Sequence, residues 1–321
     1  MRSRAYRKGE VEAENFPLAE VSDHLAHPDT VVWVDLCNPD RDELEQLKDE
    51  LGLHELAVED ALEPHQRPKL DHYAGHFFLS CHIVELVADH VTLQKTEIDA
   101  FVGDRWFITV RKGEDLDIDA IVARWDRSPD LARCGVPYLL YGLLDVVADS
   151  YFKVLDEFDD YYEQVSESLF DEHPLDPGSQ RERFQARQSL VYIHRLVNGL
   201  REAVSSLLRR DDVVPTELDP YFQDVYDHLL RANEMTDTLR ELVSSIVETN
   251  LTLRDFRQNQ VMKQVTSWAA IIAVPTLITG YYGMNVKYPG LNTTWGWALS
   301  LGLLIGCSIA LFVVFRKKGW L

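Results

Sequence analysis

The chain has 321 residues and a formal net charge of −21, and this charge is unevenly distributed. Residues 1–255 hold all 53 acids against 26 bases, a net charge of −27, whereas residues 256–321 contain six bases and no acid. An excess of acid argues against nucleic-acid binding, which depends on Lys and Arg. We therefore expect an acidic body, which is either simply solubilised by its charge or binds a cationic partner, joined to an apolar tail.

Residues 1–136 predict an N-terminal cytosolic domain of mixed α and β structure. "TVVWVDL" is typical of a strand, and "NPDRDELEQLKDELGL" and "HELAVEDAL" are typical of amphipathic helices. Three more strand candidates follow in "GHFFLSCHIVEL", "TLQKTEIDAFVG" and "RWFITVRKG". Together these segments predict an α+β domain with α/β/α layers. The N-terminus has no apolar segment of the kind found in secretory signals.

Residues 137–217 predict an antiparallel helical pair, interrupted by "HPLDPGS", and residues 218–264 a long stalk helix. Asp219 can cap the stalk, and Pro220 fits its first position. The apolar residues of the stalk repeat every seven positions, which indicates a coiled-coil-like seam with other helices rather than a helix lying on its own domain. One line of the seam is Leu218, Val225, Ala232, Leu239, Ile246 and Leu253; the other is Tyr221, His228, Met235, Leu242, Thr249 and Phe256.

Two membrane spans follow without a helix breaker between the stalk and the first of them. The first transmembrane helix is predicted at 265–282, the loop at 283–294, the second transmembrane helix at 295–315, and a basic cytosolic tail at 316–321. The spans are expected in the cell membrane, that is, the inner or plasma membrane. Basic residues precede the first span and follow the second, so both termini are expected in the cytoplasm and the loop on the outer side of the membrane.

The first span is polar for a helix that faces lipid, because it contains Pro275, Thr276 and Thr279. A single hairpin cannot enclose a pore. A cyclic homo-oligomer, with the first spans inside and the second spans facing lipid, accounts for both the polar span and the seam. A simple two-span anchor for the acidic body is the alternative.

The segment Tyr282-Gly283-Met284-Asn285 lies at the outer end of the first span and resembles the signature of the CorA family of divalent-cation (magnesium/cobalt) transport proteins. Upstream, "EDALEPHQRPKLDHY", "YLLYGLLDVVADSYF", "YFQDVYDH" and the C-terminal "KKGWL" also resemble family stretches, in the expected order. The resemblance implies a funnel-shaped homopentamer in a lipid membrane that transports Mg²⁺, often with Co²⁺ and Ni²⁺. No catalytic pattern is present, so the chain is not expected to be an enzyme.

The resemblance also implies site residues. It places Asn285 in a ring at the outer mouth, Gly280 at a narrow point of the pore and Asn259 at its cytoplasmic end. Thr276 lies four residues before Gly280 on the same helix face. The predicted selectivity filter and pore residues are Asn285, Gly283, Met284, Gly280, Thr276 and Asn259.

Asp224, in "YFQDVYDH", matches an acid that binds regulatory divalent ions between subunits of the family. Its partner carboxylate is expected from the N-terminal domain, where Glu85, Asp89 and Glu97 are candidates. Bound Mg²⁺ would relieve repulsion between acidic subunits and close the pore, so Mg²⁺ is expected to be both transported and regulatory.

The loop "VKYPGLNTT" departs from the family, whose members often carry an acid there, because it has Lys287 and no acid. A Zn²⁺-transporting branch that resembles ZntB, coupled to protons, shares this architecture and is the second interpretation. A non-conducting scaffold is the third.

Overall fold

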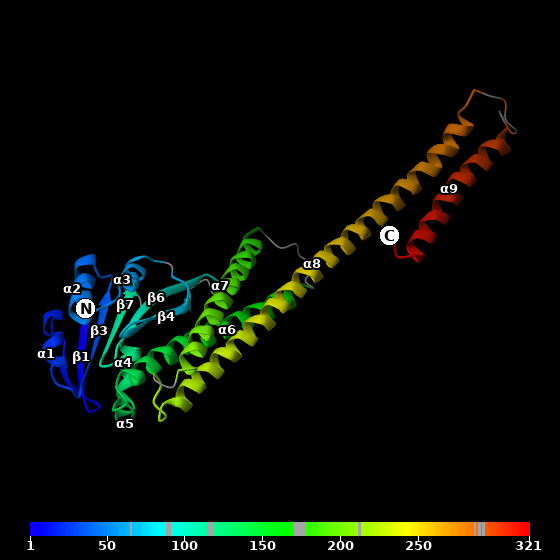
Figure 1. Ribbon diagram of the computed structural model, residues 1–321. Helices are drawn as coiled ribbons and strands as arrows, with labels where there is room; N and C mark the ends of the chain where they lie inside the picture. Colours follow the sequence, from blue (N-terminus) through cyan, green and yellow to red (C-terminus); the bar gives the residue numbers. More distant parts are fainter. Residues whose placement is uncertain are drawn as a thin grey trace. The chain divides into compact units, whose positions relative to one another are not determined.

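The computed structural model describes residues 1–64, 66–87, 91–113, 118–169, 177–210, 213–285, 287, 290 and 293–321 (Figure 1). The chain divides into two compact units, Met1–Ser244 and Ser245–Leu321.

A seven-stranded sheet organises the first unit, with strand order β2-β1-β3-β7-β6-β5-β4. Among the paired strands of the described residues, only β3 and β7 run parallel to each other. The predicted strands are confirmed as β3, β5, β6 and β7, whereas β1, β2 and β4 were missed. The strands are β1 Arg2–Arg7, β2 Glu10–Glu14, β3 Thr30–Cys37, β4 Lys69–Tyr73, β5 His76–Leu86, β6 Leu93–Val102 and β7 Trp106–Lys112.

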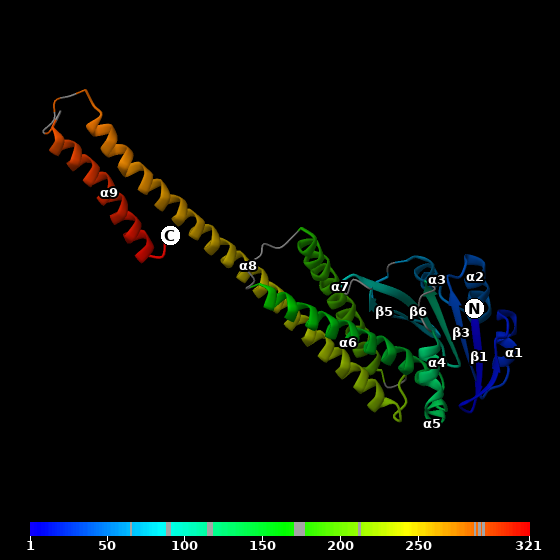
Figure 2. The same cartoon turned by 180° about the vertical axis from the view of Figure 1, so that it is seen from behind.

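Helices cover both faces of this sheet, which confirms the predicted α/β/α layers. One layer holds η1 Leu18–Glu20, α1 Val21–Leu25, α2 Arg41–Leu51 and α3 Glu55–Leu62. The other holds α4 Ile118–Asp126, α5 Pro129–Ala132, α6 Val136–Ser168 and α7 Pro177–Leu208. Figure 2 shows α6 and α7 beside the strands, seen from behind.

Alternation along β3 explains how one strand serves both layers. Val32, Val34 and Leu36 join the apolar core under α1–α3. Trp33 points to the other face, where its ring meets that of Trp125 edge-on with centroids 4.7 Å apart. The Trp125 ring is fixed there, because its Nε1–H donates to the Leu139 carbonyl at 2.9 Å. Through Trp125, helix α4 thus packs against the sheet on one side and α6 on the other.

Helix α8 runs without a break over 64 residues, Asp219–Tyr282, as the sequence predicted. Within the first unit its buried face packs on the chain's own helices: Phe222 meets the ring of Tyr141 on α6, and the Thr236 hydroxyl lies 3.0 Å from His194 Nδ1 on α7. The first unit thus shows a helix that lies on its own domain, which is the alternative that the seven-residue repeat had argued against. One predicted line is buried from Leu218 to Ile246, whereas the other was wrong by one residue, because Tyr221 is 37% exposed while Phe222 is fully buried. The second buried line is Phe222, Leu229, Thr236 and Val243.

The second unit contains the rest of α8 and helix α9, Thr294–Lys317, which lie side by side in Figures 1 and 2. Both helices contain a window long and apolar enough to cross a membrane. The first turn of α9 needs glycine at Gly296, since a Cβ there would overlap the Gly290 carbonyl. Thr293 caps α9 by accepting from the Gly296 N–H at 3.3 Å.

Candidate functional site

An exposed stripe of small and polar residues runs along α8 in the second unit. It consists of two lines spaced by seven residues: Asn259, Thr266, Ala273 and Gly280, and beside them Met262, Ala269, Thr276 and Gly283. Met262 is the one large apolar member, and Gly283 directly follows the end of α8 at Tyr282. All eight residues are exposed, and a Cβ at Gly280 would meet nothing within 4 Å. Small side chains on an apolar helix allow close approach of other helices.

The opposite face of α8 is turned to α9 instead. Ser267 is fully buried, and Val274 and Ile278 are half-buried, as are Leu304 and Leu311 of α9. The two helices therefore meet along these positions. This leaves the stripe of small residues uncovered by its own hairpin.

Oxygen atoms are concentrated near the end of this stripe that lies at Gly280 and Gly283. The hydroxyl of Thr276 donates to the Ile272 carbonyl at 2.7 Å, and that of Thr279 donates to the Thr276 carbonyl at 3.0 Å. Each hydroxyl has thereby used its proton and presents lone pairs outward. Helix α8 ends at Tyr282, and the next residue, Gly283, still donates its N–H to the Thr279 carbonyl. Asn285 comes two residues later, and its side chain is exposed. The pore residues predicted from the sequence thus lie along one helix face and just past its end.

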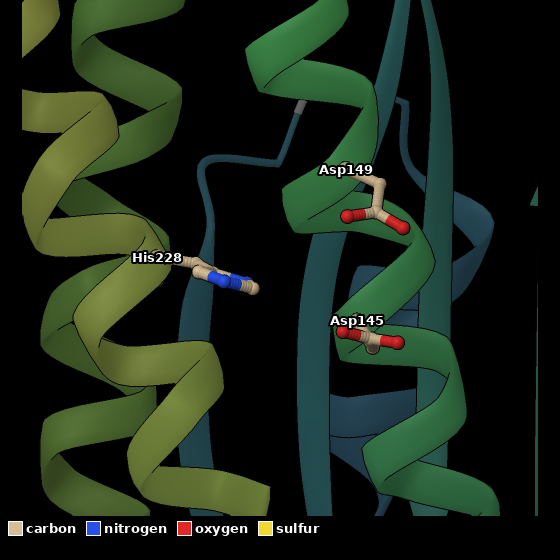
Figure 3. Close-up of side chains that lie close together, drawn as sticks. All are labelled: Asp145, Asp149 and His228. Carbon is tan, nitrogen blue, oxygen red and sulfur yellow. The ribbon is translucent and has the colours of Figure 1, made fainter.

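A second cluster lies in the first unit, where Asp145 and Asp149 project from successive turns of α6 and His228 points toward them from α8 (Figure 3). Their ligand atoms all lie within 4.8 Å of one another. Asp145 is buried, Asp149 is exposed, and the His228 ring is held edge-on against Phe152. Carboxylates are the ligands that Mg²⁺ prefers, whereas the imidazole suits Co²⁺, Ni²⁺ or Zn²⁺.

Arg124 of α4 offsets one of the two negative charges of this cluster. Its guanidinium pairs with Asp145 and lies 3.7 Å from Asp149. An incoming cation and this guanidinium would compete for the same oxygens, so any metal bound here must displace Arg124.

Asp224, the acid singled out in the sequence, lies one turn before His228 on α8. Its carboxylate is 3.8 Å from His228 Nε2, and its side chain is 61% exposed. The sequence reasoning missed Asp145, Asp149 and His228 as a set. The signal was there: two acids four residues apart in an apolar helix, and a histidine in the apolar repeat of the stalk.

The predicted partners of Asp224 fall in three different places. Glu85 is exposed on β5, and no hydrogen bond or ion pair joins it to Asp224 in the described part of the chain. Asp89 lies outside the described residues. Glu97 is a wrong candidate, because it is buried in the sheet and binds Lys112 Nζ at 2.6 Å.

Comparison with known proteins identifies the family. The sequence profile of the family described as CorA-like Mg²⁺ transporter protein matches residues 28–317. The chain belongs to the CorA-like Mg²⁺ transporter family. Members of such a family move ions through membranes, so this CorA-like chain is an ion transporter and not an enzyme.

Individual CorA proteins agree with this assignment. The cobalt/magnesium transport protein CorA of Thermotoga maritima is 30% identical over 97% of this chain and 90% of its own length. The complete structure of the CorA magnesium transporter from Methanocaldococcus jannaschii has the same fold, with a TM-score of 0.79, 23% identity and coverage of 99% of this chain and 98% of that one. The ZntB cytoplasmic domain from Vibrio parahaemolyticus shares the fold more distantly, with a TM-score of 0.57 and 16% identity over 70% of this chain and 88% of that one.

Proposed function

We propose that five copies of this chain form a CorA-type channel that passes hydrated or partly hydrated Mg²⁺ into the cytoplasm, and Co²⁺ and Ni²⁺ with it. The observation that carries the proposal is the exposed stripe on α8. One hairpin cannot surround an ion, but several copies that turn this stripe inward enclose a path lined by small residues and oxygen atoms. The α9 helices then form the outer ring that faces lipid.

The chemistry of the path suits an ion that keeps its water. Mg²⁺ dehydrates reluctantly, so a filter of neutral oxygens that accept hydrogen bonds from the water shell recognises it without stripping it. The Asn285 amide oxygen and the backbone at Gly280 provide such acceptors. Conduction also requires weak binding, and no acid follows Asp255 to trap a divalent ion.

The direction of insertion follows from the basic residues. Arg254, Arg257 and Lys263 precede the first span and three more bases follow the second, whereas Lys287 alone stands in the loop. Both termini therefore lie in the cytoplasm.

Closure is assigned to the acidic body. Subunits with a charge of −27 in residues 1–255 repel one another, and divalent ions bound between them offset this repulsion. Asp224, with Glu85 or Asp89 of a neighbouring copy, forms the regulatory site. High cytosolic Mg²⁺ holds the ring closed, and low Mg²⁺ lets the subunits separate.

Uptake into proteoliposomes tests the pore. Asn285→Ala is expected to abolish uptake of Mg²⁺ and Co²⁺, whereas Asn250→Ala, at an exposed position of α8 off the stripe, leaves uptake unchanged. If the unaltered protein takes up no ion, the scaffold interpretation stands. Zn²⁺ uptake that requires a proton gradient would favour the ZntB-like alternative, to which the imidazole of His228 is suited.

The regulatory site needs a separate measurement. Asp224→Ala is expected to weaken inhibition of the Mg²⁺ current by Mg²⁺ on the cytoplasmic side. Unchanged inhibition would exclude Asp224 as the sensor and leave the pore proposal intact.

A further inference from the structure

The C-terminal end of the membrane hairpin carries a concentrated positive charge. Arg316 and Lys317 occupy the last turn of α9, and Lys318 is its C-cap. All three side chains are exposed, and none of them has an ion-pair partner in the part of the chain that the structure describes. Three adjacent exposed cations without an internal counter-ion are available to an anion from outside.

The backbone places an aromatic pair next to Lys318. Gly319 adopts a left-handed conformation with φ +65°, and the Trp320 N–H donates to the Phe315 carbonyl at 3.0 Å, the pattern of a Schellman cap. This fold-back stacks the Trp320 ring on that of Phe315, with centroids 5.6 Å apart and planes at 10°. Lys318 Nζ lies 5.8 Å from the centre of the Trp320 ring.

Helix α8 adds a further cation at the same end of the hairpin. Lys263 lies 19 residues before Tyr282, or roughly 28 Å at 1.5 Å per residue, and Arg316 lies 22 residues after Thr294, or roughly 33 Å. The nearest acid before it along α8 is Asp255, eight residues or about 12 Å away. No Asp or Glu follows, so the sequence itself supplies no carboxylate side chain for these cations within the spans.

We propose that this basic end, formed by Arg316, Lys317, Lys318 and Lys263, binds the phosphates of anionic phospholipids, with the Phe315–Trp320 pair seated at the membrane interface. A guanidinium and ammonium groups match phosphate oxygens. A stacked tryptophan at the end of an apolar helix is typical of the headgroup level. A soluble anion would explain the cations but not the aromatic pair. The site is independent of whether ions pass through the protein.

Native mass spectrometry of the full-length protein in detergent measures the proposed binding directly. The unaltered protein is mixed with equal amounts of phosphatidylglycerol and phosphatidylcholine. We expect at least a fivefold preference for phosphatidylglycerol, and a variant with Arg316, Lys317 and Lys318 all changed to Gln is expected to lose it. An equal retention of the two lipids by the unaltered protein, or an unchanged preference in the variant, would overturn the proposal.

A matched control separates a site from net charge. Changing Lys8, Arg133 and Lys153 to Gln removes the same three charges from exposed positions of the first unit. This control is expected to keep the phosphatidylglycerol preference; its loss in the control would show that net charge alone retains the lipid.

Two measurements on the unaltered protein do not depend on the folding of any variant. Raising the salt concentration is expected to lower the phosphatidylglycerol preference, because the contact is charged. Soluble glycerol phosphate in tenfold excess is expected to leave the lipid bound. Complete displacement by glycerol phosphate would identify a plain phosphate site and refute lipid recognition.

Discussion

Removal of the guanidinium from the cluster of Asp145, Asp149 and His228 tests whether that cluster is a divalent-ion site. In the change Arg124→Gln, the buried carboxylate of Asp145 loses its neutralising partner. Removing one member of a buried ion pair costs about 3–5 kcal/mol, and the lower value applies because the Arg124 side chain is 28% exposed. A loss of about 3 kcal/mol corresponds to a fall of roughly 6–12 °C in the Tm of a unit the size of Met1–Ser244, which contains the cluster.

Magnesium is expected to reverse most of this loss. A ligand at about 100 times its Kd stabilises the folded state by about 2.7 kcal/mol, which is nearly the whole cost of the substitution. The unaltered protein gains less from Mg²⁺ at this cluster, because Arg124 already occupies its oxygens. Thermal unfolding of the detergent-solubilised protein in EDTA and in a Mg²⁺ titration measures both quantities.

Two further variants make the result specific. Arg133→Gln removes an exposed cation whose contact with Asp130 is 4.0 Å long, so its Tm is expected to stay within about 2 °C of the unaltered protein. Adding Asp145→Asn to Arg124→Gln removes the unpaired charge and is expected to raise the Tm in EDTA while abolishing the extra response to Mg²⁺. If Mg²⁺ raises the Tm of Arg124→Gln and of the unaltered protein equally, the cluster is no metal site and the reasoning is refuted.

Three other outcomes follow from the structure. Replacing Gly by Ala within a helix usually stabilises the fold by about 1 kcal/mol. A Cβ at Gly142 would instead lie 2.5 Å from two atoms of the Trp125 ring, so Gly142→Ala is expected to lower the free energy of unfolding by about 1–3 kcal/mol, measured by thermal unfolding. A stabilised variant would contradict this packing. Burial raises the pKa of Asp99 to about 6 from 3.8, so the contribution of this group to stability is present at low pH and is lost as pH rises through 6. In denaturant titrations, the free energy of unfolding of the unaltered protein should fall by up to about 3 kcal/mol between pH 4 and 7 relative to Asp99→Asn. Parallel pH profiles of the two proteins would refute this. Lys287→Glu is expected to raise Mg²⁺ uptake about tenfold at low salt and little at high salt, and equal uptake at low salt would exclude Lys287 from the entry path.

The sequence predicted those strands whose side chains alternate, and it missed those held by distant partners. Strand β3 is a nearly continuous run of β-branched and other apolar residues, TVVWVDLC, which identifies it locally. Strand β1 reads "RSRAYR", yet Arg4 is almost fully buried because it pairs with Asp126, 122 positions away, at 3.0 Å. No local pattern contains that partner, so the charges of β1 resemble those of a loop.

The same distinction separates the two candidate sites. The stripe on α8 is set by the period of one helix, so spacing alone relates Thr276 to Gly280. The metal-ligand cluster joins Asp145 on α6 to His228 on α8, and only tertiary packing brings these helices together. Tyr221 and Phe222 are both aromatic and adjacent in the sequence, so no local pattern tells which of them is buried. Tertiary packing buries Phe222 and leaves Tyr221 exposed.

The spacing of the stripe has a mechanical consequence. A straight α-helix drifts by about 20° for each seven residues, so from Asn259 to Gly280, three such repeats, its two ends point about 60° apart. All four residues of that line can face one axis only where the helices wind around it with a left-handed twist. Unwinding that bundle swings the Asn259 end away from the axis while Gly280 stays in place. In the proposed pore, a small rotation applied to the stalk would thus move Asn259 far more than Gly280.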